Sequence, residues 1–366
     1  MKSSCIFKNL SFIISSFIFY ILLSSSAHAC TAISLKAEDG DLLMGRTMEW
    51  GMFNFNSEIR VVPRNYEFIG STPDKKPGLK WKSKYGFTGI TVFNKNAFTD
   101  GINEKGLVVA LLYHPNFAKY SKYDPNKADE TMGPLDVITF LLTTCENVND
   151  VREAMKKIKV TSVIEPALKI TPPVHFIVTD QKKHQIVIEF KDGEVIIYDA
   201  PLGVLTNDPF YDWQITNLRN YLFLKPESIS DKKIKGINFA PLGVGSGMLG
   251  MPGDFTPPSR FVRAVYLSST ARKTPNGPET LYEMFQILDN FNVPLTPEEA
   301  KKHPKMRSDT QWTVVSDTKN LVLYYHTQNN RRVRMVDLNK INFANTIIVK
   351  QPLDKIPEQD IQNVTP

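Results

Sequence analysis

The stretch CTAISLKAEDGDLLMGRTMEW occupies residues 30–50 and begins with a cysteine. TAISLKA at 31–37 is typical of a β-strand, Glu-Asp-Gly at 38–40 favours a turn, and DLLMGRTMEW at 41–50 returns as a second strand. The stretch therefore predicts a β-hairpin with a thiol at its first residue. What precedes the cysteine decides which chemistry this thiol can perform.

The residues before the hairpin have the pattern of a secretory signal. The start carries lysines, an apolar run LSFIISSFIFYILL follows at 10–23, and small residues end in Ala-His-Ala at 27–29. A positive start, a short apolar core and an Ala-x-Ala site are the three parts of such a signal, and the core is short for a membrane span. We therefore predict that residues 1–29 are a signal peptide removed by cleavage before Cys30, and that the mature protein is exported to the periplasm or secreted.

Two other fates of this segment stay open. An uncleaved segment would act as a membrane anchor, although the Ala-x-Ala site argues against it. Lipoprotein processing would also leave Cys30 as the first residue, but that route favours Leu three residues earlier, where this chain has Ala27. A lipid-anchored binding protein without catalysis is thus the alternative from another functional class.

Composition and charge are those of an exported globular protein. A hydrophobic fraction of 42% and a charged fraction of 22% match a soluble, core-forming chain. The formal net charge of +6 is small and evenly spread, which argues against a nucleic-acid partner. Composition does not change abruptly along residues 30–366, so we expect a single domain that ends in a short, extended tail at 351–366.

Cysteine usage singles out Cys30. Of the three cysteines, Cys5 would leave with the signal, and Cys145 ends an apolar helical run, where a buried and inert thiol is usual. Cleavage before Cys30 would give this residue an α-amine with a pKa of about 7.7–8.0, which suits a general base near neutral pH. Nucleophile and base would then come from one residue, although the sequence alone leaves open that cleavage merely exposes a cysteine.

Strands and helices are predicted in separate blocks rather than in strict alternation. Further strands are expected at 58–63, 87–93, 107–114, 175–180, 185–190, 194–200, 203–207, 310–317, 320–326 and 331–338. Helices are expected at 134–145, 147–158 with an Asn cap, 211–222, 259–273 and 279–291, and a long Gly- and Pro-rich loop at 222–258. Such blocks favour packed sheets with helices outside, an α+β sandwich with its layers in the order αββα.

Five motifs in order resemble one family. They are Cys-Thr-Ala at 30–32, GRTMEW at 45–50, NEKGL at 103–107, LTNDP at 205–209 and GMPGDFTPPSRFVR at 250–263. Together they resemble the choloylglycine hydrolase family, which includes bile salt hydrolases and penicillin V acylases and belongs to the cysteine N-terminal nucleophile hydrolases. The resemblance runs from Cys30 to about residue 345 and implies the four-layer αββα sandwich of those enzymes.

The resemblance also implies catalytic roles. Cys30 would attack a linear amide through an acyl-enzyme, with its own α-amine moving the proton. The side chain of Asn207 and the backbone N–H of Tyr113 would hold the oxyanion, a contribution worth about 3–4 kcal/mol per donor. Arg46 and Arg260 match two family arginines near the nucleophile, where cations favour the thiolate.

Two residues bear on how closely the chain follows the family. One differs from the usual family residue, and the other stands at a position where family members differ from one another. Glu49 stands where the family usually has an Asp that holds the α-amine, so its carboxylate extends one methylene further. Position 113 is Asn in many bile salt hydrolases and Tyr in several penicillin V acylases, so Tyr113 leans toward the acylases or serves as an aromatic wall for the acyl group. The resemblance further implies an apolar acyl pocket in the loop after the hairpin, lined by Trp50, Met52, Phe53 and Phe55.

The substrate class stays open among three amides. Conjugated bile salts, penicillin V and N-acyl homoserine lactones each present an amide with a bulky or apolar acyl side, and the sequence does not choose among them. No cofactor or metal is expected, because the six histidines are scattered without the spacing of a metal site. We expect no nucleic-acid partner and no stable membrane anchor after processing, and family resemblance implies a homotetramer.

Overall fold

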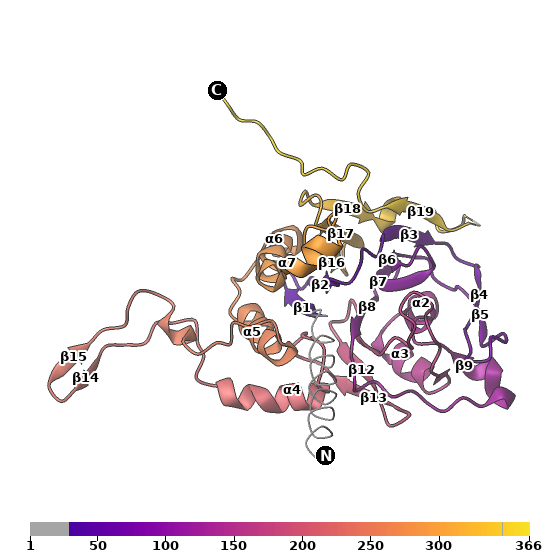
Figure 1. Ribbon diagram of the computed structural model, residues 1–366, viewed down its shortest axis with the longest axis horizontal. Helices are drawn as coiled ribbons and strands as arrows, with labels where there is room; N and C mark the ends of the chain where they lie inside the picture. The colour runs from indigo at the N-terminus through magenta and orange to yellow at the C-terminus, as the bar shows by residue number, and fades with distance from the viewer. Residues whose placement is uncertain (1–28, 346) are drawn as a thin grey trace, which may run out of the picture.

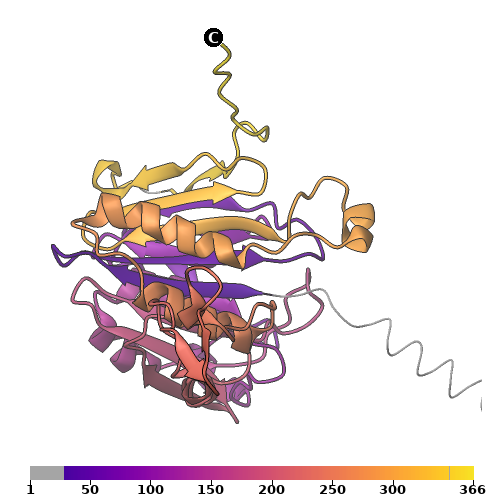
Figure 2. The same ribbon diagram turned by 90° about the vertical axis from the view of Figure 1, so that its left-hand side faces the viewer.

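The structure, a computed structural model, describes residues 29–345 and 347–366. Two β-sheets lie face to face and helices cover the outer face of each, so the layers follow the order helix, sheet, sheet, helix (Figures 1 and 2). The predicted αββα sandwich of the α+β class is confirmed. The predicted signal peptide lies outside the described residues except for Ala29.

The first sheet has five antiparallel strands and carries Cys30. Its order is β1 (Cys30–Lys36), β2 (Leu42–Glu49), β16 (Thr310–Asp317), β17 (Val322–Thr327) and β18 (Arg334–Asp337). The predicted hairpin is β1 with β2, in a register that sets Cys30 opposite Met48. On its other edge β2 pairs with β16, so β2 lies between the neighbouring strand β1 and a strand from far along the chain, and β1 forms the edge of the sheet.

The second sheet has eight strands and contains most of the remaining β-structure. Its order is β13 (Glu194–Asp199), β12 (Gln185–Lys191), β11 (Val174–Thr179), β8 (Val108–Tyr113), β7 (Ala97–Asn103), β6 (Phe87–Val92), β3 (Glu58–Val62) and β19 (Val349–Pro352). Alternate residues point to opposite faces. Val108, Ala110 and Leu112 of β8 thus join the core between the sheets, while Val109 and Leu111 join the core beneath the helices.

Four helices form the outer layers. α5 (Pro257–Ser269) and α6 (Gly277–Leu288) pack on the five-stranded sheet, and α2 (Val137–Thr144) packs on the eight-stranded sheet. α3 (Val148–Met155) contributes to the same core as α2, and its predicted cap is confirmed because the Asn147 side chain accepts hydrogen bonds from two backbone N–H groups. In α6, for example, Met284, Ile287 and Leu288 join the core at the three- to four-residue spacing of one helix face.

Shorter elements connect these layers. They are β4 (Glu67–Ile69), β5 (Lys80–Lys82), β9 (Thr131–Met132), β10 (Lys159–Val160), α4 (Tyr211–Asn217), β14 (Lys232–Ile234), β15 (Ile237–Phe239), α7 (Pro297–Lys302) and short 3₁₀ turns at Pro125–Glu130, Leu218–Tyr221, Ser246–Met248, Asp289–Phe291 and Leu338–Lys340. Within the described part of the chain, no helix combines the length and the apolar character needed to cross a membrane.

The expected strand at 203–207 is wrong. Only Leu205 pairs with a neighbour, exchanging two backbone hydrogen bonds of 2.8 and 3.1 Å with Ala32 of β1. Gly203 has a φ of +62°, a left-handed conformation that ends extended structure. The segment therefore contacts β1 through one residue pair, Ala32 with Leu205. This contact places the following residues, which include Asn207, beside Cys30.

Two expected irregular segments contain strands. The predicted loop at 222–258 includes the hairpin of β14 and β15, which extends away from the body of the molecule (Figure 1). The predicted tail at 351–366 begins inside the eight-stranded sheet, since β19 pairs with β3 and Leu353 is buried.

The strand β7 was not predicted. Its sequence, AFTDGIN, carries polar and Gly residues that are typical of turns.

Candidate active site

Cys30 lies buried at the first position of β1, in the layer between the two sheets. Cys30 and Cys145, the two cysteines in the described chain, are both free thiols. Burial raises the pKa of Cys145 to about 12, which makes that thiol unreactive near neutral pH. Cys30 is the thiol that contacts a charged side chain.

Arg46 holds the thiol of Cys30. Its Nη2 donates to Cys30 Sγ at 2.9 Å, and its Nη1 forms an ion pair of 3.0 Å with Asp100. Nη1 also donates to the carbonyl of Leu111 at 2.9 Å, and the guanidinium lies 5.2 Å from the ring of Trp312. Because Arg46 is fully buried, these partners are needed to offset the cost of burying its charge.

Asp100 is a site residue that the sequence analysis missed. It lies in β7, the strand that went unpredicted, and its FTDG context reads as a turn. Burial raises the pKa of Asp100 to about 7, and the adjacent Arg46 acts in the opposite direction. The ion pair joins β2 of one sheet to β7 of the other at the nucleophile.

Arg260 fixes the backbone of the nucleophile rather than its sulfur. From α5, its Nη1 donates to the Cys30 carbonyl and to Thr31 Oγ1, and its Nη2 donates to Asn207 Oδ1 at 2.6 Å. Burial lowers the pKa of Arg260 to about 10, which leaves it charged at neutral pH. The arginine therefore connects α5, β1 and the segment that carries Asn207.

Asn207 reaches the nitrogen of Cys30. Its Oδ1 accepts the Cys30 N–H at 2.9 Å, and its Nδ2 donates to the carbonyl of Tyr113 at 2.6 Å. Two donors at Oδ1 and an acceptor at Nδ2 fix the orientation of the amide. One of the two Nδ2 hydrogens serves Tyr113, and the other is the group that could bind an oxyanion.

Tyr113 presents its backbone to the same place. The N–H of His114 donates to Pro173 at 2.8 Å, on the β11 side of the strand. N–H groups alternate sides along a strand. The Tyr113 N–H therefore points to the side on which the Tyr113 carbonyl meets Asn207 and the Leu111 carbonyl meets Arg46. This is the direction that the predicted oxyanion role requires.

Glu49 lies close to the N-terminal side of Cys30 but does not bind its nitrogen. In the chain with Ala29 attached, the Glu49 N–H donates to the Ala29 carbonyl at 3.1 Å, and Glu49 Oε1 accepts from Thr310 at 3.1 Å. Oε2 is buried and makes no hydrogen bond within the described residues. Burial raises the pKa of Glu49 to about 7. The contact with a free α-amine stays a prediction.

An apolar cavity of about 50 Å³ opens beside the thiol. Trp50, Phe55, Phe93 and Tyr113 supply its aromatic walls, and Leu135, Leu168 and Pro172 complete it from the other side. Of the four predicted acyl-pocket residues, Trp50 and Phe55 line the cavity. Phe53 packs against both of their rings, with centroids 5.9 and 5.4 Å away, and Met52 is 47% exposed and outside the lining.

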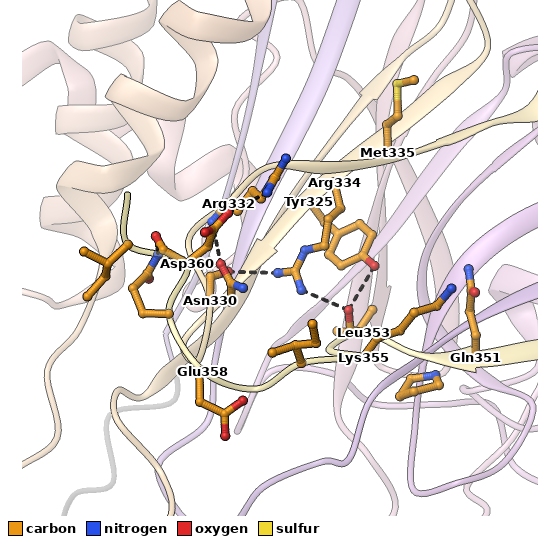
Figure 3. A pocket seen from close by; sticks show the side chains of 14 residues that line it. Tyr325, Asn330, Arg332, Arg334, Met335, Gln351, Leu353, Lys355, Glu358 and Asp360 are labelled. Carbon is orange, nitrogen blue, oxygen red and sulfur yellow. Dashed lines mark hydrogen bonds and ion pairs between the residues drawn. The ribbon is translucent and has the colours of Figure 1, made fainter. Parts of the chain in front are cut away.

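A larger cavity of about 670 Å³ lies elsewhere, between β17, β18 and the C-terminal segment (Figure 3). Several of its polar side chains form ion pairs or hydrogen bonds. Arg334 pairs with Asp354. Arg332 pairs with Asp360, and the Tyr325 hydroxyl donates to the Leu353 carbonyl (Figure 3). These contacts anchor the tail to the sheet, and the lining contains none of the nucleophile's neighbours.

One group of metal-ligand side chains occurs among the described residues, formed by His114, His175 and Glu189. Their ligand atoms lie within 4.8 Å of one another, but the two imidazole rings are stacked, with centroids 4.1 Å apart and planes 13° apart. An imidazole binds a metal in its own ring plane, at about 2.0–2.1 Å for zinc. One ion cannot lie in both planes, so this geometry does not fit a shared metal.

Comparison with known proteins places this site in a family. A model of "Linear amide C-N hydrolases, choloylglycine hydrolase family" matches residues 30–352. Bile salt hydrolase/transferase of Clostridium perfringens is 31% identical over 318 residues, which cover 86% of this chain and 93% of that protein. The chain belongs to the choloylglycine hydrolase family. It is therefore a hydrolase of linear amide C–N bonds, as the five motifs predicted.

A further relative and two solved structures are also similar to this chain. Penicillin V acylase of Pectobacterium atrosepticum is 25% identical over 346 residues, covering 88% of this chain and 84% of that protein. The crystal structure of a variant of conjugated bile acid hydrolase from Clostridium perfringens superimposes with a TM-score of 0.79 at 29% identity, covering 92% of this chain and 100% of that one. Penicillin V acylase from Agrobacterium tumefaciens, with a TM-score of 0.71 at 22% identity, covers 89% and 92% and shares the fold.

The geometry of Asn207 gives a direct prediction for catalysis. We expect Asn207→Ala to lower kcat by about 10²–10³, because its amide would act mainly as charge develops on the carbonyl oxygen. The change in KM should be much smaller, since the ground-state carbonyl is held less strongly. Steady-state kinetics on the mature enzyme measure both constants. A change confined to KM would move Asn207 from the oxyanion site to ground-state binding.

Proposed function

We propose that this protein is an exported cysteine N-terminal nucleophile hydrolase that cleaves an amide with an apolar acyl group through an acyl-enzyme on Cys30. The observation that carries the proposal is the pair of contacts at one residue, Arg46 on Sγ and Asn207 on the backbone nitrogen. Both reactive atoms of Cys30 are thus held by side chains beside an apolar cavity. The family match that begins at Cys30 supports the same residue.

Cleavage before Cys30 would turn its amide nitrogen into an amine. That amine accepts the thiol proton, and Sγ attacks the substrate carbonyl to form a C–S bond. Asn207 Nδ2 and the Tyr113 N–H stabilise the oxyanion, and Arg46 stabilises the thiolate. The α-ammonium, held by Glu49, returns the proton to the leaving nitrogen as the C–N bond breaks. Water activated by the amine then hydrolyses the thioester and releases the acid.

Export by a signal peptide is part of this proposal. Ala29 is 2% exposed and its carbonyl accepts the Glu49 N–H, so a residue attached to Cys30 fills space beside the nucleophile. Removal of residues 1–29 would both create the base and clear this space. In the alternative of a lipid-anchored binding protein, an acylated amine could not accept the thiol proton, and the same site would bind without catalysis.

The cavity supports an apolar acyl group, and the relatives support two families of substrate. Aromatic and aliphatic walls favour an apolar acyl group over a charged one. Relatives named for conjugated bile acids and for penicillin V support these two amides, and an N-acyl homoserine lactone presents the same kind of bond to the same site. The reaction at Cys30 is the same for all three.

A substrate panel with a nucleophile variant tests the proposed function. We expect the mature enzyme to hydrolyse at least one of a conjugated bile salt, penicillin V and an N-acyl homoserine lactone, and Cys30→Ala to abolish the activity because the covalent route is lost. Initial rates by product detection, with circular dichroism to verify folding, provide the measurement. Full activity of folded Cys30→Ala would contradict the nucleophile, and a wild type inactive on all three would contradict the substrate class.

We further propose a homotetramer, held in part by the protruding arm at residues 229–249. This arm contains the hairpin of β14 and β15, and its apolar side chains are widely exposed, including Phe239 at 53%, Leu242 at 102% and Val244 at 97%. Exposed apolar groups gathered on one projection are typical of a protein-protein contact. In the proposed tetramer, the arm of each chain would pack on a neighbouring subunit, which is another copy of the same chain.

Light scattering after size-exclusion chromatography tests this assembly. We expect the wild type to have the mass of four chains, and the double variant Leu242→Asp with Val244→Asp to dissociate, because charges would be buried in the contact. Ile361→Asp in the C-terminal tail is the matched control, since Ile361 is 80% exposed and lies outside the arm. A wild-type monomer, or a tetramer unchanged by the arm variant, would contradict the proposal.

A further inference from the structure

A buried pair formed by His175 and Glu189 contacts the segment that carries Asn207. Both side chains are fully buried, and His175 Nδ1 lies 3.2 Å from Glu189 Oε1. On the other side of the ring, His175 Nε2 lies 2.9 Å from the carbonyl oxygen of Thr206. Thr206 precedes Asn207, so this carbonyl belongs to the peptide unit that joins the two residues.

The hydrogen-bond pattern determines which ring nitrogen of His175 carries a hydrogen. A carbonyl oxygen only accepts, so His175 Nε2 must carry a hydrogen. In a neutral ring, Nδ1 then carries no hydrogen and can only accept. Glu189 can donate to it if its carboxyl group is protonated. Burial lowers the pKa of His175 and raises the pKa of Glu189, and both shifts favour the shared proton on Glu189. Both groups are then neutral and both nitrogens are bonded.

The surroundings hold this pair in place. The Tyr211 N–H donates to both carboxyl oxygens of Glu189, at 3.0 and 3.2 Å. His114 stacks on His175, and burial lowers its pKa to about 2, so it packs as a neutral ring. The charge of Asp212 raises the pKa of Glu189, and the charge of Lys191 lowers it. The ring of His175 therefore has a fixed position and a fixed tautomer.

The Thr206 peptide has few other supports. Leu205 bonds to Ala32 on the nucleophile strand, and the Thr206 hydroxyl donates to the Pro257 carbonyl at 3.1 Å. The segment forms no regular strand there, so no ladder fixes the Thr206 carbonyl. His175 donates to this carbonyl from β11, opposite to the contact with β1. The peptide is thus held between the two sheets.

We propose that His175, oriented by Glu189, is a positioning residue that sets the Asn207 amide at the nucleophile through the Thr206 carbonyl. His175 acts through the backbone and touches neither the thiol nor the substrate in this scheme. The inference rests on the proposed function, because the position of Asn207 matters for catalysis only if its amide binds the oxyanion. A displacement of about 1 Å in such a group can lower a rate by about 100-fold.

Two amide substitutions at position 175 separate positioning from burial. His175→Gln can bring its side-chain amide N–H to the place of Nε2, whereas His175→Asn is one methylene shorter and cannot reach the Thr206 carbonyl. We expect His175→Asn to lower kcat by roughly 10- to 100-fold with KM within about threefold, and His175→Gln to recover kcat to within about fivefold of wild type. Glu189→Gln should act like His175→Gln, since its amide can donate to Nδ1 and accept from the Tyr211 N–H.

Two further measurements exclude a purely structural role. The rate of Cys30 alkylation by iodoacetamide should stay within about threefold of wild type in His175→Asn, because that reaction needs the thiolate and forms no oxyanion. His326→Asn serves as a matched control, since His326 is also a buried histidine but lies on β17 away from Asn207, and it should keep the wild-type kcat.

The outcomes are distinguishable. An active wild type together with an unchanged kcat in folded His175→Asn would overturn this inference and leave the proposed function intact. Equal losses of kcat in the Asn and Gln variants, or a parallel loss of alkylation rate, would overturn it as well. One zinc bound per chain in a His175-dependent manner would replace it with a metal site. A wild type inactive on every amide would overturn the proposed function and this inference together.

Discussion

The buried guanidinium of Arg46 is the constraint on which the site depends. A charge buried between two sheets is stable only if it is paired and fully hydrogen-bonded. Arg46 meets this need with groups from both sheets, namely Asp100 on β7, the Leu111 carbonyl on β8, and Cys30 on β1. The ion pair therefore holds the two sheets together at the point where the reactive thiol is placed, and the thiol gains a cation as its neighbour.

A second set of contacts orients the nitrogen of the same residue. Arg260 binds the Cys30 carbonyl and Asn207, and Asn207 binds the Cys30 nitrogen and the Tyr113 carbonyl. Asn207 comes from an irregular segment, and such segments need specific partners to hold one conformation. Arg260 supports it from α5, Leu205 ties it to β1, and His175 supports it from β11. Sulfur and nitrogen of one residue are thus positioned by separate groups.

Much of this arrangement is predictable from sequence, for different reasons at different residues. The hairpin of β1 and β2 follows from alternation and turn chemistry, and Cys30, Arg46, Asn207 and Arg260 follow from motifs whose order matches the family. Asp100, His175 and Glu189 were missed because each lies in a strand outside the five motifs, and their partners come from other strands. Burial converts them into site residues, and burial depends on tertiary packing that no local pattern encodes.

Glu49 shows the limit of transferring roles by motif. Its position matches a family aspartate, yet in the chain that still carries Ala29 its backbone N–H binds Ala29 and its carboxylate meets Thr310. The longer side chain thus has a partner of its own. Met52 likewise lies in the pocket loop, between Trp50 and Phe55, but its side chain is 47% exposed, whereas those two rings pack against each other.

In the proposed mechanism, removal of everything before Cys30 creates the catalytic base. The most direct test compares kcat/KM of two proteins verified by intact mass, one beginning at Cys30 and one that retains Ala29. We expect turnover by the first and a rate at least about 100-fold lower for the second, since an amide nitrogen cannot accept the thiol proton. Equal kcat/KM, with Ala29 still present in the mass spectrum after the assay, would contradict it.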